Sequence, residues 1–470
     1  MRISRTEQQA RNRQAVLTAA RAEFAERGYT EAKIERIAER ADLTRGAVYS
    51  NFPSKRSLYL AVLLAAANQD AAAARDAPPP WEAPYPRNTA VPPDTSPDDA
   101  TSSDELPGAA GPNDASGSGD SPRAAGRTNA TDGEELLSAA EWDGLTGEHH
   151  SHPPMDWANG LAVDRDANLR PASHGDSVGG RNAGSSAAGG GLEALDVASA
   201  AETFARVWLE RLPLAYGDAT VGRLKARSLT GVFDDERGRA ALAQITWLEA
   251  LLLAVALESC RARDAGRRVR LAELILTMLH GAAGLGETAP GFGDAFDVAR
   301  ACRHLAGLDI ADEWNPPYLP YVPLAKEVRS AWAAPGEVVD ELSGRPFELG
   351  DGVVVALGPG RLGGAEDAVR AARAGEVVTI VAVTDDPAET GALVRLRLTD
   401  LTTVLRRIFG PAFRPSLRLV LDDNGTLASA IGVTPTFDTE TSVRIQRGEI
   451  TFRADNRGAA YAATIAGRTQ

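Results

Sequence analysis

The stretch AVLTAARAEFAERGYTEAKIERIAERADLTRGAVYSNFPSKRSL, from Ala15 to Leu58, decides the fold of the amino-terminal part of this 470-residue chain. Apolar residues recur at helical spacing from residue 8 until Gly28, a usual helix stop. A second, short helix is expected over residues 32–40, and a further helix begins at Thr44 after a tight turn. Two short helices joined by a turn of about three or four residues are typical of a helix-turn-helix motif.

The helix that begins at Thr44 has the side chains of a DNA reader. Thr44 can cap it, and the small residues Gly46 and Ala47 allow its amino end to approach a base-pair edge or a phosphate closely. Lys55 lies at the start of the next helix, where it suits a phosphate. The residues predicted to contact DNA are Thr44, Arg45, Gly46, Ala47, Tyr49, Ser50, Asn51 and Lys55.

This stretch resembles the DNA-binding domain of the TetR (tetracycline-repressor-like) family of bacterial transcriptional regulators. The landmarks of that family occur in order at Gly28, Tyr29, Ile37, Ala38, Gly46, Tyr49, Phe52, Ser54, Lys55 and Leu58. Three positions depart from the pattern. Ala32 stands where a Thr usually caps the second helix, Asp42 stands where the turn usually has Gly, and Arg56 stands where an acidic residue is common.

The resemblance implies a regulator, most simply a repressor, that binds a palindromic double-stranded DNA operator as a homodimer and is released by a small ligand. A single helix-turn-helix reads only a few base pairs, which is why a two-fold dimer is expected. Arg2, Arg5, Arg11 and Arg13 add basic charge at the start of the chain, and they form either an arm that reaches the DNA or a solvated end.

The charge of the chain is unevenly distributed. The formal net charge is −14, yet residues 1–70 carry 12 basic and 8 acidic side chains, whereas residues 71–190 carry 7 basic and 19 acidic ones. Residues 71–190 also contain 14 of the 28 prolines and no Ile, Phe or Lys, so we predict a disordered acidic linker. The histidines at 149, 150 and 152 lie within it, and no metal site is predicted there.

The whole-chain composition excludes several classes of protein. The two cysteines, Cys260 and Cys302, are too few for a disulfide scaffold or a four-cysteine metal site. The start of the chain has no apolar signal region, and no run of about 18 apolar residues occurs. A cytoplasmic protein that does not span a membrane is therefore expected.

Beyond the linker, the sequence predicts a helical region with helices over residues 193–212, 235–263, 269–282 and 292–308. The second of these is apolar on most of its circumference, which predicts a buried central helix. By the resemblance, residues 267–285 and 293–308 would pair with their copies in a four-helix dimer interface. A pocket for a small, mostly apolar effector is predicted to be lined by Trp247, Leu251, Met278 and His280, although these residues also suit a plain core or dimer interface.

The last part of the chain alternates strand-like and helix-like stretches. Strands are predicted over residues 353–357, 377–383 and 417–421, helices over 365–374 and 399–408, and then a hairpin over 442–454 and a final helix over 458–466. The alternation predicts parallel strands with crossover helices, and the hairpin makes the sheet mixed.

Two interpretations of this part remain open. The loop GPGRLG (Gly358–Gly363) fits the G-x-G-x-x-G pattern of a dinucleotide-binding turn, but that pattern expects an acidic residue about 20 positions later, and the candidate here, Asp385, lies 27 positions after Gly358. Alternatively, the stretch from Leu419 through Thr434-Pro435 to the hairpin resembles the second half of a thioredoxin-like or peroxiredoxin-like domain. That resemblance implies a cis proline that faces redox cysteines, and the loop Gly358–Gly364 has none. We favour the thioredoxin-like interpretation.

The predicted architecture is multidomain, with two all-α parts and an α/β part. Residues 1–70 form the DNA-binding domain, 71–190 the linker, 191–335 a helical ligand-binding and dimerisation domain, and 336–470 a thioredoxin-like α/β domain. We expect a transcriptional regulator without enzymatic activity or cofactor. The alternatives are a nucleotide-binding oxidoreductase that carries a regulatory helix-turn-helix, and a DNA-tethered scaffold whose last domain binds a protein partner.

Overall fold

The computed structural model describes residues 4–76, 196–212, 224–260, 266–289, 291–410, 413 and 415–467. The acidic linker predicted for residues 71–190 lies outside the described residues except for positions 71–76, which continue a helix. The predicted histidine cluster in the linker also lies outside them.

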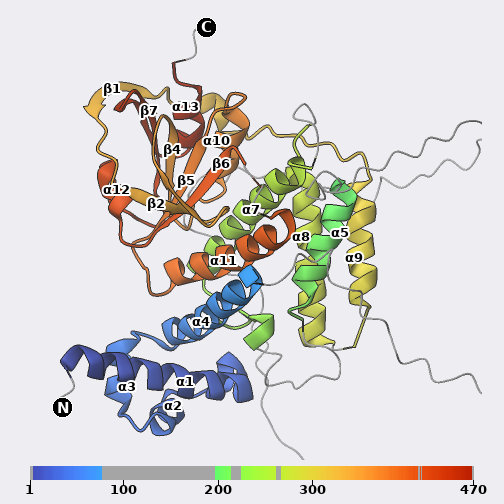
Figure 1. Ribbon diagram of the computed structural model, residues 1–470, viewed down its shortest axis with the longest axis vertical. Coiled ribbons are helices and arrows are strands. Elements are labelled where there is room, and N and C mark those ends of the chain that lie inside the picture. Colours follow the sequence, from blue (N-terminus) through green and yellow to red (C-terminus); the bar gives the residue numbers. More distant parts are fainter. Residues whose placement is uncertain are drawn as a thin grey trace, which may run out of the picture. The chain divides into compact units, whose positions relative to one another are not determined.

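The amino-terminal helices confirm the predicted helix-turn-helix (Figure 1). They are α1 (Arg5–Glu31), α2 (Ile34–Arg40), α3 (Arg45–Asn51) and α4 (Lys55–Asp76). Gly28 interrupts α1 at a φ of 72°, and Asp42 adopts a φ of 54° in the turn between α2 and α3. The turn therefore keeps the left-handed conformation with Asp in place of Gly, because a short polar side chain tolerates that region.

The middle of the chain is helical, as predicted, with α5 (Val197–Leu209), α7 (Glu236–Glu258), α8 (Val269–Thr288) and α9 (Ala295–Ala306). α7 is the buried central helix of this region. α7 and α8 are also long and apolar enough to cross a membrane by length and composition, a test that the core helix of a water-soluble protein passes as well. Of the most apolar window of α7, 67% is buried inside the protein, which is what a core helix requires.

The carboxy-terminal region contains the predicted mixed sheet. Its strands are β1 (Lys326–Ala331), β4 (Gly352–Leu357), β5 (Val378–Val383), β6 (Leu417–Asp422), β7 (Glu440–Gln446) and β8 (Glu449–Asp455), in the order β1-β8-β7-β4-β5-β6. β4, β5 and β6 are parallel, whereas β7, β8 and β1 follow as antiparallel neighbours. The helices are α10 (Gly364–Ala371), α11 (Thr390–Phe409), α12 (Thr426–Ala430) and α13 (Ala459–Ile465).

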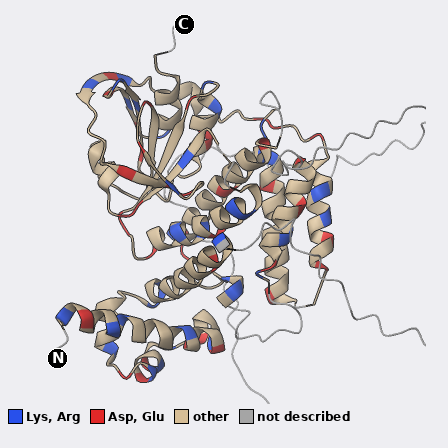
Figure 2. Cartoon of the chain, viewed as in Figure 1, with Lys and Arg blue, Asp and Glu red and all other residues tan. Residues whose placement is uncertain are grey.

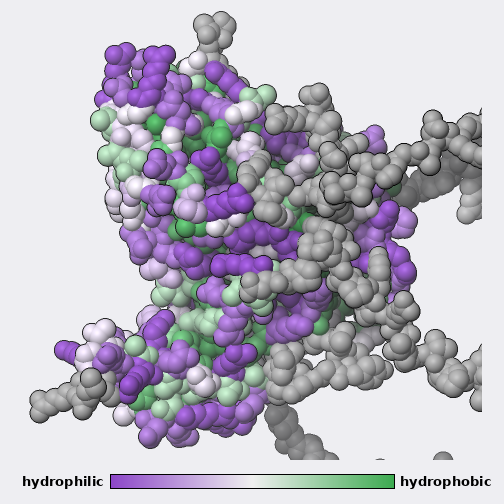
Figure 3. All heavy atoms as spheres, viewed as in Figure 1, coloured by the Kyte–Doolittle hydropathy of each residue, from purple (hydrophilic) through white to green (hydrophobic). Residues whose placement is uncertain are grey.

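The sequence did not predict strand β1, helix α12, the short 3₁₀ turn η1 (Leu319–Tyr321) or the small hairpin of β2 (Glu337–Asp340) and β3 (Arg345–Glu348). The edge strand β1 is exposed along nearly its whole length and carries Lys326, Glu327 and Arg329. Figure 3 shows hydrophilic atoms over this corner of the molecule. Charges on an edge strand discourage pairing with other sheets, so their presence here is a common protection against aggregation.

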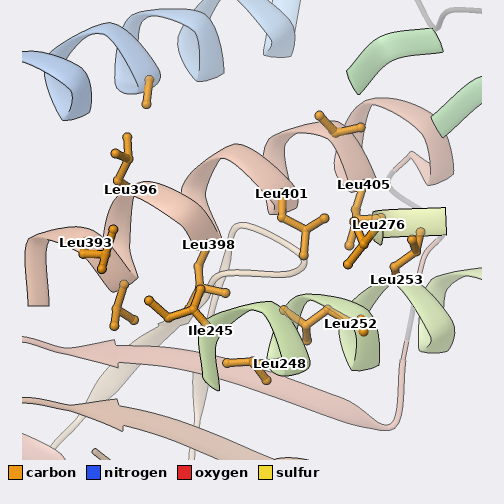
Figure 4. Close-up of a cluster of buried hydrophobic side chains, with 14 of the residues drawn as sticks. Ile245, Leu248, Leu252, Leu253, Leu276, Leu393, Leu396, Leu398, Leu401 and Leu405 are labelled. Carbon is orange, nitrogen blue, oxygen red and sulfur yellow. The ribbon is translucent and has the colours of Figure 1, made fainter. Parts of the chain in front are cut away.

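Helix α11 connects the sheet region to the helices. It packs against α4 on one side and against α7 on another, and Figure 4 shows its leucines among those of α7. One apolar core therefore runs from Phe24 in the helix-turn-helix through Leu248 of α7 to Val355 on one face of the sheet. A second cluster, which includes Val354 and Val381, covers the opposite face.

Candidate DNA-binding site

Helix α3 presents one exposed face and one buried face. Val48 is buried in the core, whereas Thr44, Arg45, Tyr49 and Ser50 are exposed. The Thr44 side chain accepts a hydrogen bond from the Ala47 N–H at 3.2 Å, which confirms its role as the helix cap. The predicted readers on this face are therefore open to a partner, with Gly46 exposed between them.

Arg45 is held by two neighbours. It forms an ion pair with Glu35 of α2 at 2.8 Å, and its guanidinium lies 5.5 Å from the centre of the Tyr49 ring. Both members of the ion pair are more than half exposed, so water screens their attraction and a phosphate or base can compete for Arg45. The sequence did not indicate the role of Glu35, because spacing alone does not show that residues ten positions apart on two different helices are neighbours.

The end of α3 is fixed by internal hydrogen bonds. The Asn51 amide and the Ser50 hydroxyl both donate to the Ala47 carbonyl oxygen. Arg13 donates to the Asn51 carbonyl oxygen at 3.1 Å, and its guanidinium lies 4.3 Å from the centre of the Phe52 ring. Reading a base with Asn51 or Ser50 would require these side chains to exchange a local acceptor for the DNA.

The proposed basic arm is largely helical. Ser4 caps α1 through a reciprocal pair of hydrogen bonds with Glu7, and the helix begins at Arg5. Arg5 and Arg11 therefore lie on a helix, Arg13 supports α3, and Arg2 lies outside the described residues. The helix starts earlier than the apolar pattern indicated because of this capping motif, and a contact of these arginines with DNA stays a prediction.

Lys55 does not point freely away from the protein. Its ammonium donates to the Thr30 carbonyl oxygen at 3.0 Å and lies 4.7 Å from the centre of the Tyr29 ring. Partial burial lowers the pKa of Lys55. This side chain connects the start of α4 to the end of α1, and a DNA phosphate would have to compete with the Thr30 carbonyl oxygen for the Lys55 ammonium.

A buried carboxylate joins α1 to α2. Glu23 is fully buried, accepts from the Lys33 N–H at 3.4 Å and lies within 3.3 to 3.7 Å of Arg27, Arg36 and Arg40. Three arginines are thus partly neutralised close to the DNA-reading helix. Figure 2 shows acidic residues among the basic ones over these helices. A single acidic residue on the apolar face of α1 was the only sign of this network in the sequence.

The geometry defines a helix-turn-helix DNA-binding domain. Residues 16–62 match the family model of the bacterial regulatory proteins of the tetR family. The amino-terminal helices are therefore the DNA-binding domain of that family, as the resemblance indicated. Comparison with curated proteins and with solved structures gave no match.

The four residues predicted to line an effector pocket meet different neighbours. Trp247 is 55% exposed and lies beside Gly363, whereas Leu251 is buried in the core. Met278 lies next to Cys302, with 3.9 Å between the two sulfurs. None of the four lines the cavity beside Arg56 and Asp235 or the small cavity beside Pro359 and Leu362. A shared pocket for these residues stays a prediction.

His280 belongs to a polar cluster in the helical core. Its Nε2 lies 3.1 Å from the Arg397 guanidinium, and its ring meets the Trp208 ring edge-on at 5.4 Å. Burial and the charge of Arg397 lower the pKa of His280 to about 4, so this imidazole is neutral near pH 7.

Buried ion pairs connect α11 to the helical middle. Arg397 of α11 binds both carboxylate oxygens of Glu249 of α7, and the first of these contacts is 2.8 Å long. Asp400 of α11 pairs with Arg211 at 3.1 Å and with Arg227 at 3.0 Å. Sequence analysis missed these pairs, because charged residues on a helix are normally expected to face water.

The glycine-rich loop after β4 is closed by protein groups. The Gly358 and Gly360 N–H groups donate to the carbonyl oxygens of Thr439 and Phe437 at 2.8 Å, and the Gly363 N–H donates to the Gln244 side chain. A Cβ at Gly358 would lie 2.2 Å from a backbone oxygen. These glycines allow close packing of the chain, and the amides that a pyrophosphate would need already have acceptors. The loop thus lacks the open cradle of a dinucleotide-binding turn.

The two cysteines have the character expected of small apolar side chains. Cys302 is buried and Cys260 is half-buried. Burial raises the pKa of each thiol to about 11, which keeps it protonated near neutral pH.

Proposed function

We propose that the chain is a bacterial transcriptional regulator that binds a palindromic operator as a homodimer and leaves it when a small ligand binds. The observation that carries the proposal is the tetR-family DNA-binding domain at residues 16–62, with the exposed face of α3 available for the major groove.

The exposed apolar residues of α8 and its surroundings support the dimer. Leu274 and Leu285 of α8 are 45% and 44% exposed, and Phe292 and Phe296 before and within α9 are 72% and 58% exposed. Large apolar side chains that remain exposed in the single chain are typical of a surface that a protein partner covers. Pairing of α8 and α9 with their copies in a four-helix arrangement would cover them.

The topology of the carboxy-terminal region supports a thioredoxin-like domain that has no dithiol chemistry. Three parallel strands are followed by an antiparallel hairpin beside β4, and the loop after β4 contains no cysteine. We propose that this domain serves regulation, either by sensing a ligand or by binding a protein partner. The competing oxidoreductase function finds no support in the loop, whose amides already have protein acceptors.

The test is selection of binding sites from random duplex DNA by the full chain, together with sedimentation in the absence of DNA. We expect a dimer that selects two inverted half-sites about one helical turn apart. Asn51→Ala and Tyr49→Ala should change the selected bases, whereas Asn68→Ala, on the exposed surface of α4, should not. A monomer that selects no sequence would refute the proposal.

A further inference from the structure

The start of α4 is occupied by a carboxylate from a distant part of the chain. Ser54 donates its hydroxyl to Glu389 Oε1 at 2.5 Å, and Arg56 donates to Glu389 Oε2 at 3.2 Å. Glu389 lies between β5 and α11 of the carboxy-terminal region. We propose that Glu389 occupies the place of a DNA phosphate and thereby holds the DNA-binding domain in an inhibited state. We call these three residues the latch.

The latch uses the groups that a phosphate requires. Both carboxylate oxygens of Glu389 have a donor, one a hydroxyl and the other a guanidinium. They sit at the amino end of a 22-residue helix, where N–H groups and the helix dipole favour an anion. Ser54 and Arg56 follow the last residue of α3 by three and five positions, so the same donors lie next to the DNA-reading helix.

Arg56 is positioned for this role by two further contacts. It donates to Asp235 at 2.7 Å, and its guanidinium lies 4.8 Å from the centre of the Phe233 ring. Arg56 is also one of the three departures from the family pattern, in a place where an acidic residue is common. An acidic residue would repel Glu389, so the contact depends on this departure.

Glu389 is held by the turn that begins α11. The Asp386 carboxylate accepts from the Glu389 and Thr390 N–H groups, each at 3.1 Å. α11 itself packs along α4, so a displacement of α11 would move Glu389 relative to Ser54. The latch thus links the carboxy-terminal region directly to the helix that carries the DNA-binding domain.

The latch is accessible enough to open. The side chains of Arg56 and Glu389 are 28% and 25% exposed, and they border a cavity of about 320 Å³ that Arg237 and Asp385 also line. A DNA phosphate can therefore compete for Ser54 and Arg56 once Glu389 moves away. Since water still reaches about a quarter of each side chain and screens their attraction, we expect inhibition of moderate strength.

The inference rests on the proposed function, and Glu389→Ala in the full chain tests it. The matched control is Asp423→Ala, which removes an acidic partner of Arg395 in the same region and touches no residue of the latch. Binding of both variants and of the parent chain to random duplex DNA is measured between about 50 and 200 mM salt. Glu389 makes no side-chain cap contact with α11, so its truncation should leave the fold intact.

We expect Glu389→Ala to bind tighter than the parent at low salt, with a salt slope steeper by about one, because one more phosphate is contacted. Its advantage should shrink about threefold to fourfold over that salt range. Adding Ser54→Ala and Arg56→Ala should abolish the advantage, and Asp423→Ala should match the parent.

Equal affinities and slopes for the parent and Glu389→Ala would overturn the latch while leaving DNA binding intact. Absence of DNA binding by all variants would instead refute the proposed function. Hydrogen exchange without DNA adds an independent measurement: Glu389→Ala, but not Asp423→Ala, should speed exchange in the first turn of α4. Equal exchange in these two variants would also overturn the latch.

Discussion

The DNA-binding domain and the carboxy-terminal region use their loops and helix starts in opposite ways. In the first, α3 keeps Thr44, Arg45 and Tyr49 exposed on one face. In the second, the loop Gly358–Gly363 gives its N–H groups to protein acceptors. The exposed side chains of α3 belong to a helix-turn-helix that a family model matches, whereas glycines serve close packing as readily as they serve a ligand.

The largest expected effect tests whether these two regions share one cooperative core. Glu249→Ala leaves Arg397 without its carboxylate in the helical core, and breaking a buried pair from one side costs about 3 to 5 kcal/mol of unfolding free energy. Denaturant unfolding followed by circular dichroism should show a single transition at lower midpoint.

The control for Glu249→Ala is Asp297→Ala, which breaks an exposed pair with Arg300 on α9 and should change stability by less than about 0.5 kcal/mol. Two separate transitions in the parent chain would contradict a shared core. They would show that the two regions, which α11 connects, unfold independently.

The same contrast explains which parts of the fold can be predicted from the sequence alone. The helices of the DNA-binding domain were predictable because Thr44, Gly28 and the apolar stripe indicate the same elements, although the start of α1 at Arg5 was missed. The strands β4, β5 and β6 were predictable as short apolar runs. The contacts made by α11 were not, because a helical pattern shows that a face is apolar without showing which partner covers it.

The candidate site was predictable only in part. The sequence pointed to the exposed readers of α3, but the ion pair of Arg45 with Glu35 and the contact of Lys55 with Thr30 depend on how three helices pack. The latch joins residues more than 300 positions apart, and local spacing contains no trace of such a pair.

A second change sharpens the comparison at the glycine loop. Gly358→Ala places a Cβ against the backbone oxygens of Thr436 and Phe437, and overpacking of this kind costs about 1 to 3 kcal/mol. Thermal unfolding should register the loss. Gly281→Ala on α8 is the control, since open space surrounds that position and alanine favours a helix by about 1 kcal/mol. If Gly358→Ala were as stable as Gly281→Ala, the loop would be open and a ligand role for it would regain support.

A third prediction concerns the carboxylate of Glu440, which accepts from the Gly458 N–H at 2.7 Å at the start of α13. Burial raises the pKa of Glu440 to about 7. The folded state therefore binds this proton more tightly than the unfolded state, so the stability it contributes is present below about pH 4 and is lost as the pH rises through 7.

Glu440→Gln keeps an acceptor and carries no charge, so it should stabilise the chain by about 1 to 2 kcal/mol at pH 8 and leave it unchanged near pH 4. Denaturant unfolding at a series of pH values measures this difference. Glu449→Gln, at the exposed first residue of β8, should show no such dependence. If the difference in unfolding free energy between the two proteins did not change between pH 4 and 8, the Glu440 carboxylate would be solvated, and its burial would be contradicted.

The smallest expected effect lies on the exposed side of the comparison, at the ion pair between Glu35 and Arg45. Glu35→Gln removes a negative charge beside the DNA-reading helix and frees the Arg45 guanidinium for a phosphate or a guanine. Because both side chains are more than half exposed, the gain in DNA affinity should be only a few-fold and should fade as salt rises.

Glu39→Gln removes the same charge from the same helix outside this ion pair, and it therefore measures the general electrostatic contribution. If Glu35→Gln alone also shifts the selected bases, then Glu35 positions Arg45 for reading. If both variants strengthen binding equally without a change in selected bases, Arg45 acts on the DNA only through its charge, and the exposed face of α3 reads sequence with Tyr49, Ser50 and Asn51.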